Sequence, residues 1–412
     1  MSPPARRLPP TTRAAAMTMA GVLAACAALA GAVAACGVAA GEDVSSTAGS
    51  ASAVSSAGAS ASSPPPSSTG AAPSTNSAAA PPGATGSADA VPPVPPGRPA
   101  GEIVLVDEEA YPATIDEQRA ALFRRMSAAL GLDEAAMGRV QAIFAGSKVM
   151  GQGNPKVTKY PMTRKECREK RAAAGVTEPA HPLCGAPFMV PVYDPGAGQS
   201  EKDASLCIDE YEFPGVPCEH PVVWVSSREA HELCGAIGKR LCDTHEWEGA
   251  CAGAVHSPEV EYAFGKSRRD MRHSHNQDRE LVWSYGPGKE HAKCGTASKK
   301  NKGCTSSGFK ACGSNTYPAG SFPGCKSPFG AYDLHGNAAE HMNFPMKPAE
   351  LTSAGGTGQT EMKGSWFIFS TYEAHPDDCR WRAPDWHATR LMDRNSHANY
   401  HLGFRCCKDV KH

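Results

Sequence analysis

The distribution of cysteines constrains this chain more than any other feature. It contains 16 cysteines, and all except Cys26 and Cys36 fall between Cys167 and Cys407. Cysteines that bind structural metals usually come in C-x-x-C pairs, and the sequence contains no such pair. In an exported protein this scatter indicates a disulfide framework, because disulfides persist only in oxidising compartments. The prediction of a disulfide-rich fold therefore depends on export.

The first 36 residues carry an export signal. Three arginines precede an apolar run of Ala, Val and Leu that ends at Cys36, and this order is typical of a secretory signal peptide. The small residues before Cys36 resemble the lipobox of bacterial lipoproteins. We therefore expect residues 1–36 to be a signal peptide with a lipobox, and lipidation of Cys36 to anchor the protein in a membrane. Lipidation of Cys26 and an uncleaved transmembrane helix are the alternatives.

Composition divides the remaining chain into three parts. Residues 37–100 are almost entirely Ala, Ser, Gly, Pro and Thr, too poor in apolar side chains to fold, and are predicted to be a disordered linker. Residues 101–150 are interpreted as a helical lead-in, and residues 151–412 as the main domain. We expect the protein in the periplasm, or at the outer membrane or cell surface. The formal net charge of -1 argues against nucleic acid and acidic lipid surfaces as partners, and against a charge-driven function.

Local signals predict several elements. Thr114 with Glu117 forms a capping-box pattern before apolar residues at helical spacing, and Gly131 and Asp133 mark the turn to a second helix. This pair is interpreted as a helical hairpin packed on the main domain. Further on, a β-rich run at 221–225 precedes two more capped helices, starting near 226 and 243, and Gly238 is expected to stop the first of them.

A series of motifs resembles successive signatures of the sulfatase-modifying factor (formylglycine-generating enzyme) family. They are CIDEYE at 207–212, HPVVWVS at 220–226, GKRL at 238–241 with EWE at 246–248, NTYPAGS at 315–321, FGAYDLHGNAAE at 329–340, KGSW at 363–366 and LGFRC at 402–406. The resemblance implies a single α+β domain of the C-type-lectin-like type, disulfide-rich and with low regular secondary structure.

The stretch from Asp333 to Glu340 combines two carboxylates with a glycine turn. Carboxylate and carbonyl oxygens are the ligands that calcium prefers. The resemblance implies a structural calcium ion bound by the side chains of Asp333 and Glu340 and by the carbonyls of Leu334, Gly336 and Ala338. A glycine turn with flanking acids is the alternative reading.

The expected copper site is incomplete. Family enzymes oxidise a sulfatase cysteine to formylglycine, and the resemblance places their two copper-binding cysteines just after the Gly-Ser-aromatic motif. Two close thiolates bind Cu(I) well, but here Ile368 occupies the first position and the next cysteine is Cys379. An isoleucine cannot bind a metal or exchange a disulfide. Copper is therefore not expected, and no catalytic residue is assigned.

The residues around the motif glutamate also differ from the family. Aromatic side chains usually flank it, whereas Ala339 and His341 stand here. Ser365, Trp366 and His341 are the candidates for the lining of an inherited groove, although His341 alone is interpreted as a surface or hydrogen-bonded histidine. His273 and His275 alternate as they would on one face of a strand, which is a weaker metal hypothesis.

The resemblance implies two disulfides, Cys234–Cys406 and Cys251–Cys379. The ten other cysteines of the main domain could form five more bridges, and those at 294, 304, 312 and 325 are expected to staple a Gly/Lys/Ser-rich loop. A redox-active or copper-binding pair among these ten is the functional alternative.

Three functions are left open. The first is an anchored, calcium-stabilised domain that binds a peptide, a sulfatase-like protein or a small ligand. The second is an active formylglycine-generating oxidase with thiolates from elsewhere in the chain. The third is an iron-dependent sulfoxide synthase, and against it the stretch 114–146 contains no histidine.

Overall fold

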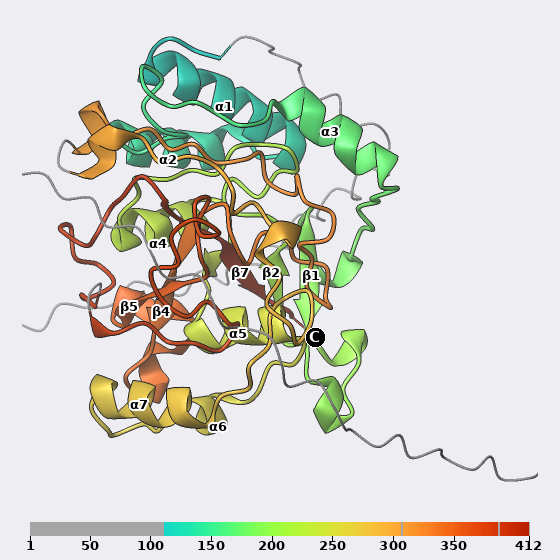
Figure 1. Cartoon of the computed structure of the whole chain (residues 1–412). Coiled ribbons are helices and arrows are strands. Elements are labelled where there is room, and N and C mark those ends of the chain that lie inside the picture. Colours follow the sequence, from blue (N-terminus) through green and yellow to red (C-terminus); the bar gives the residue numbers. More distant parts are fainter. Residues whose placement is uncertain (1–110, 306–307, 386–387, 412) are drawn as a thin grey trace, which may run out of the picture. The chain divides into compact units, whose positions relative to one another are not determined.

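A computed structural model describes residues 111–305, 308–385 and 388–411 (Figure 1). The predicted signal peptide, the predicted lipobox with Cys36, and the predicted linker lie outside the described residues. The helices are α1 (Ile115–Leu130), α2 (Glu134–Ala145), α3 (Arg164–Ala173), α4 (Ser227–Ala236), α5 (Thr244–Ala252), α6 (Pro258–Glu261) and α7 (Arg268–Asp278). The strands are β1 (Met189–Val192), β2 (Leu206–Asp209), β3 (Arg240–Leu241), β4 (Ala339–Phe344), β5 (Gln359–Lys363), β6 (Leu402–Phe404) and β7 (Cys406–Asp409). Short elements joined by long loops confirm the expected α+β class with low regular structure.

The strands form two small sheets between the helices. One sheet has the order β1-β2-β7-β3, and all of its pairings are antiparallel. The other has the order β5-β4-β6, in which β4 runs antiparallel to β5 and parallel to β6. Figure 1 shows α1 and α2 on one side of these strands and α6 and α7 on the opposite side. Because β6 and β7 follow each other directly, the C-terminal segment joins both sheets.

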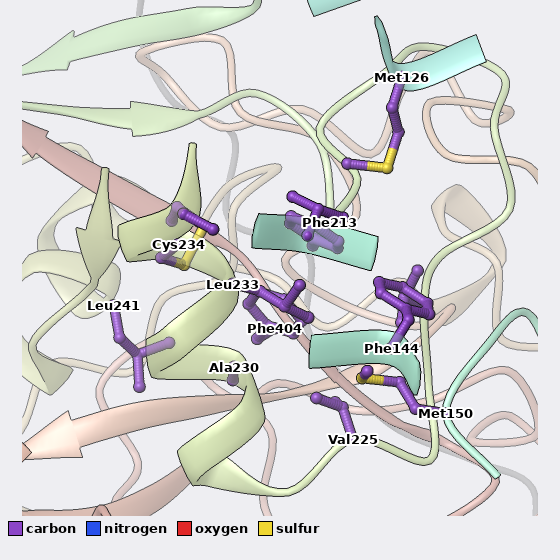
Figure 2. Close-up of a cluster of buried hydrophobic side chains, with 14 of the residues drawn as sticks. Met126, Phe144, Met150, Phe213, Val225, Ala230, Leu233, Cys234, Leu241 and Phe404 are labelled. Carbon is purple, nitrogen blue, oxygen red and sulfur yellow. A yellow bond between two sulfur atoms is a disulfide. The ribbon is translucent and has the colours of Figure 1, made fainter. Parts of the chain in front are cut away.

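The helical lead-in packs on the main domain as expected. Thr114 caps α1, since its hydroxyl accepts the N–H of Glu117 while the Glu117 carboxylate accepts the N–H of Thr114. Gly131 then ends α1 in the left-handed region. The buried stripes of α1 and α2 meet side chains of the main domain in one hydrophobic cluster, where Met126 and Phe144 lie with Phe404 (Figure 2). Burying a side chain of this size contributes about 1.5–3 kcal/mol.

A buried ion pair adds to this packing. The carboxylate of Glu219 is 2% exposed and accepts hydrogen bonds from Arg125 of α1, Arg164 of α3 and Gln152. Burial alone would raise the pKa of Glu219, but Arg164 and Arg125 hold that pKa well below its usual value. Opposite charge close to a carboxylate favours its ionised form. The lead-in is therefore joined to the domain by charge as well as by apolar contact.

One predicted strand does not form. The run 221–225 is not a strand, and only Val223 makes a β-bridge, with Gly151. Trp224 has a φ of 58°, in the left-handed region that interrupts an extended chain. The two helices that follow are capped as predicted, by Ser226 with Glu229 and by Asp243 with Glu246.

Seven disulfides connect the fold. The structure contains Cys234–Cys406 and Cys251–Cys379, the two pairings that the resemblance implies. The others are Cys167–Cys218, Cys184–Cys207, Cys242–Cys407, Cys294–Cys325 and Cys304–Cys312. The last two lie within the Gly/Lys/Ser-rich loop, as expected.

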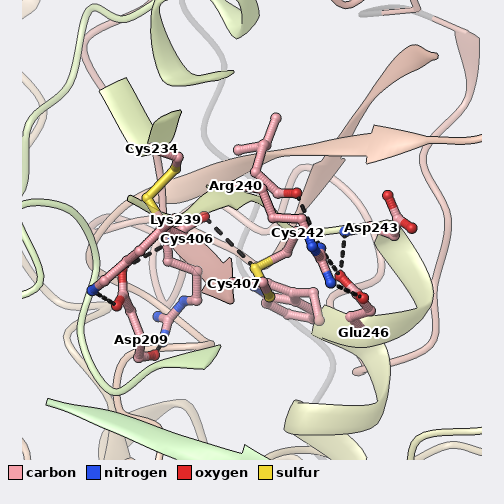
Figure 3. Close-up of a disulfide and its surroundings, with 12 residues drawn as sticks. Asp209, Cys234, Lys239, Arg240, Cys242, Asp243, Glu246, Cys406 and Cys407 are labelled. Carbon is pink, nitrogen blue, oxygen red and sulfur yellow. Dashed lines mark hydrogen bonds and ion pairs between the residues drawn. A yellow bond between two sulfur atoms is a disulfide. The ribbon is translucent and has the colours of Figure 1, made fainter. Parts of the chain in front are cut away.

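Neighbouring cysteines of β7 bridge in different directions. Successive side chains of a strand point to opposite faces, so Cys406 reaches Cys234 on α4 while Cys407 reaches Cys242 beyond β3 (Figure 3). Bridges of this number indicate an extracytoplasmic protein. Among the residues that the structure describes, no helix is long and apolar enough to cross a membrane.

Candidate functional site

The segment in which the resemblance places copper-binding cysteines is a packed aromatic core. Trp366, Phe367, Ile368 and Phe369 are each at most 6% exposed. They form one hydrophobic cluster together with Val223, Trp224, Cys312, Ala338 and Tyr400. Hydrocarbon therefore fills the position where a metal-binding thiolate is expected.

The three groove candidates lie beneath the surface. Ser365 is fully buried, and its hydroxyl accepts the N–H of Gly336 and donates to the carboxylate of Asp377. Trp366 is stacked on His401, with the ring centroids 4.4 Å apart. His341 is 1% exposed, with its Nε2 atom 3.0 Å from the carbonyl oxygen of Val225. These contacts give all three residues packing and positioning roles.

An open cavity lies elsewhere in the fold. It has a volume of about 670 Å³ and is lined by the start of β5 and by residues of the loops beside β4 and β5, among them Met346, Gln359 and Arg390. The buried carboxylate of Asp243 holds one of those loops by accepting the N–H groups of Thr352 and Ser353. None of the groove candidates lines this cavity.

Two of the three side-chain groups that could hold a metal contain disulfides. Among the described residues these are Cys251 with His335 and Cys379, and a group containing Cys242 and Cys407. The Nε2 atom of His335 lies 3.4 Å from the sulfur of Cys251 and accepts the N–H of Ser284. Burial lowers the pKa of His335 to about 4, so this histidine is neutral. A bridged sulfur is not a thiolate, and these groups hold no metal while the bridges are intact.

The third group consists of Glu248, Glu261 and His275. His275 lies on α7, so the expectation that His273 and His275 share one face of a strand is wrong. Arg382 is fully buried and pairs with both glutamates, at 2.9 and 3.0 Å. Lys363 also pairs with Glu248, and Arg380 with Glu261. Because these cations neutralise both carboxylates, the group is a buried ion network.

The residues expected to bind calcium lie in a buried acidic cluster. Asp333 and Glu340 are 2% and 1% exposed. Arg405 lies against Glu340, with its Nη2 atom 2.7 Å from Oε1 and its Nε atom 2.8 Å from Oε2. Trp247 also donates to Oε2 of Glu340. Both oxygens of Glu340 are therefore already satisfied by protein donors.

The same cluster contains more carboxylates than Arg405 can neutralise. Burial and the neighbouring carboxylates raise the pKa of Glu212 well above its usual value, and burial raises the pKa of Asp333 to about 6. Glu212 nevertheless accepts the N–H of Ala338, and Asp333 accepts that of Gly320.

The five-residue calcium set stays a prediction. The cluster carries surplus negative charge, while one of the expected ligands, Glu340, already has the guanidinium of Arg405 against it. Leu334 and Gly336 contribute to the same buried turn, in which Gly336 has a φ of 78°. Arg405, the partner of Glu340, belongs to the LGFRC motif, but the sequence carries no signal that connects the two residues.

The comparisons with known proteins agree with this fold. Residues 156–410 match the family model of the sulfatase-modifying factor enzyme 1-like domain. A search of curated proteins finds no match. Since the matched region covers more than half of the chain, the protein belongs to the sulfatase-modifying factor enzyme 1-like family.

Proposed function

We propose that this chain is an exported, lipid-anchored member of the family that binds a ligand and does not carry out copper-dependent oxidation of a sulfatase cysteine. The observation that carries the proposal is that the cysteines of the domain are bonded in disulfides. All fourteen cysteines from Cys167 to Cys407 are in disulfides, and Ile368 stands where the first copper ligand is expected.

The oxidation requires thiolates that this domain does not offer. A copper ion that activates oxygen is held by two soft sulfur ligands close together. Only a thiolate can serve, and a cystine sulfur has no such charge. The aliphatic side chain of Ile368 is 3% exposed within an aromatic cluster and offers neither a ligand nor an opening.

The anchor is part of the same proposal. Lipidation of Cys36 would tether the domain in the cell envelope through the Ala/Ser/Pro-rich residues 37–100. It is tested by metabolic labelling with a fatty acid: a Cys36→Ala variant is expected to lose the label, and a Cys26→Ala variant is expected to keep it. Label that survives Cys36→Ala would remove this lipidation site.

The central experiment combines a thiol count with an activity assay. The purified domain is denatured without reductant, alkylated and analysed by mass spectrometry, and no cysteine between 167 and 407 is expected to be labelled. An Ile368→Cys variant is the matched control, because it should show one label. In parallel, the folded domain is incubated with copper, oxygen and a cysteine-containing sulfatase peptide, whose mass should stay unchanged.

Two outcomes would overturn the proposal. One is a pair of labelled cysteines in the natural sequence together with copper binding. The other is conversion of the peptide cysteine to formylglycine, which would establish an active oxidase whatever its ligands.

A further inference from the structure

The balanced net charge of the chain conceals a strongly basic region. Residues 291–332 contain six lysines and no aspartate, glutamate or arginine. Residues 135–165 also lack acidic side chains and include Lys156 and Lys159. A sum over the whole chain hides this separation, because the acidic residues lie in other segments.

Hydrogen bonds join the two acid-free segments. The side-chain amide of Asn301 donates to the carbonyl of Val157 at 3.0 Å, and that of Asn154 donates to the carbonyl of Phe309 at 2.8 Å. The N–H of Lys159 donates to the side chain of Asn315 at 2.7 Å. Lysines far apart in the sequence are therefore carried on neighbouring backbone.

These lysines form what we call the basic face, made of Lys156, Lys159, Lys299, Lys300, Lys302 and Lys310. All six are exposed, and none makes an ion pair with a carboxylate in the part of the chain that the structure describes. The ammonium group of Lys300 lies over the ring of Tyr400, 5.6 Å from its centroid. A lysine that has no carboxylate partner within the protein remains available to an external anion.

Two disulfides cross-link the loop that carries four of these lysines. Cys304–Cys312 closes a small ring within it, and Cys294–Cys325 closes a larger one around it. The loop belongs to the orange part of the ribbon in Figure 1. A cross-linked loop loses less conformational entropy on binding than a loop without cross-links.

The basic face borders the segment that replaces the copper site. Phe309 and Cys304 pack against the cluster that contains Trp366 and Ile368, and Cys312 belongs to that cluster. An extended ligand lying across the basic face would therefore pass beside the position at which the family's substrate is expected to react.

We propose that the basic face binds an acidic, extended segment of another polypeptide. This deepens the proposed ligand-binding function by naming the class of partner, and it rests on that function. Lysine ammonium groups are point charges on flexible stems, which suit a run of carboxylates more than one oriented anion. Complementary charge also speeds and orients the encounter.

The surroundings favour a polypeptide over a bilayer or a nucleic acid. Faces that dock on membranes combine basic side chains with exposed apolar ones that enter the bilayer, and single-stranded nucleic acids stack on exposed aromatic side chains. The exposed large hydrophobic residues in the described part of the chain are Tyr111, Val260, Leu281, Tyr372 and Met392. None of them lies in 135–165 or 291–332, and Tyr372, which interacts with Tyr400 beside Lys300, offers one ring and not a row of stacking side chains.

The test is fluorescence anisotropy with the full mature domain and a labelled oligoglutamate peptide. Saturable binding that weakens as salt is added is expected, because salt screens exposed charges. A labelled oligoglutamine peptide of equal length should not bind. The triple variant Lys299→Glu, Lys300→Glu, Lys302→Glu is expected to raise the dissociation constant about tenfold or more, because it replaces three attractive charge contacts with repulsive ones.

A second triple variant supplies the control for total charge. Lys202→Glu, Lys266→Glu, Lys411→Glu makes the same change at exposed lysines elsewhere, and it should bind like the natural sequence. Equal losses in both variants, or no binding of oligoglutamate by the natural sequence, would refute the proposal. So would binding of anionic vesicles or single-stranded DNA in preference to oligoglutamate. None of these results depends on thiols, so a failure here is distinct from a failure of the non-oxidase proposal.

Discussion

Removing the disulfide Cys234–Cys406 is expected to cost less stability than removing Cys184–Cys207, although the first spans 172 positions and the second 23. In the loop-entropy model the stabilisation grows with the loop that a bridge closes. Taken alone, the two bridges would be worth about 5.2 and 3.5 kcal/mol. The order should reverse because another bridge closes almost the same loop.

That bridge is Cys242–Cys407 (Figure 3). While it is intact, Cys234 and Cys406 close only a ring that runs through residues 234–242 and back through 407 to 406. This ring holds about 11 residues, which corresponds to about 2.8 kcal/mol. When Cys234–Cys406 is already absent, Cys242 and Cys407 close a ring of about 39 residues that runs through Cys251–Cys379. Removing Cys242–Cys407 as well therefore costs about 3.9 kcal/mol.

The assay is guanidinium unfolding of three oxidised variants in which both cysteines of a bridge are replaced by alanine, together with the combined variant lacking both Cys234–Cys406 and Cys242–Cys407. All of these cysteines are buried, so the packing lost with the sulfur atoms is similar. The combined variant should lose about 1 kcal/mol more than the two single losses added together. Strictly additive losses, or a larger cost for Cys234–Cys406 than for Cys184–Cys207, would refute the argument.

Three further predictions concern single sites. Glu219→Gln should destabilise the fold by about 3–5 kcal/mol, because it leaves two arginines with a neutral partner. Folding lowers the pKa of Glu219, so the stability that this carboxylate contributes is present above its usual pKa and is lost as the pH falls below about 4.5. Between pH 5 and 3 the stability of the variant should therefore fall less than that of the natural sequence. Parallel curves of stability against pH would contradict this. Calcium is expected to raise the melting temperature, because the carboxylates of Glu212, Asp333 and Glu340 outnumber the charge of Arg405; no rise, or a rise that chelation does not reverse, would remove the calcium site. Ile368→Cys should cost about 2 kcal/mol in urea unfolding and give a thiol that is labelled slowly in the folded protein, whereas rapid labelling would show an open cleft at this position.

The sequence predicted those parts of the fold that depend on short-range signals. Thr114 with Glu117, Ser226 with Glu229 and Asp243 with Glu246 are capping boxes in the structure. A capping box needs only two side chains three positions apart, so it can be recognised without tertiary information. Gly131 and Gly238 also take the left-handed conformations expected of them.

Long-range contacts explain what the sequence did not predict. The run 221–225 has a strand-like composition, but the partner strand it would need is reduced to one bridge at Gly151. His273 and His275 suggested a strand, whereas Ser267 caps a helix at this point. Glu340 and Arg405 are 65 positions apart, and no local pattern connects them. The basic face is not visible in the net charge of the chain, because acidic residues in other segments cancel the charge of its lysines.

Under the two proposals, this domain differs from a copper-dependent oxidase in its sulfur chemistry and in its basic face. Two free thiols held close together in an oxidising compartment tend to become a disulfide, so a working copper site must be kept reduced or filled with metal. A buried isoleucine at position 368 has no such requirement, and it stabilises the segment by packing within the aromatic cluster. The lysines beside the segment are carried by a loop with its own disulfides, so this replacement leaves the basic face unchanged. The proposed absence of copper chemistry and the proposed binding of an acidic polypeptide are therefore physically independent in this fold.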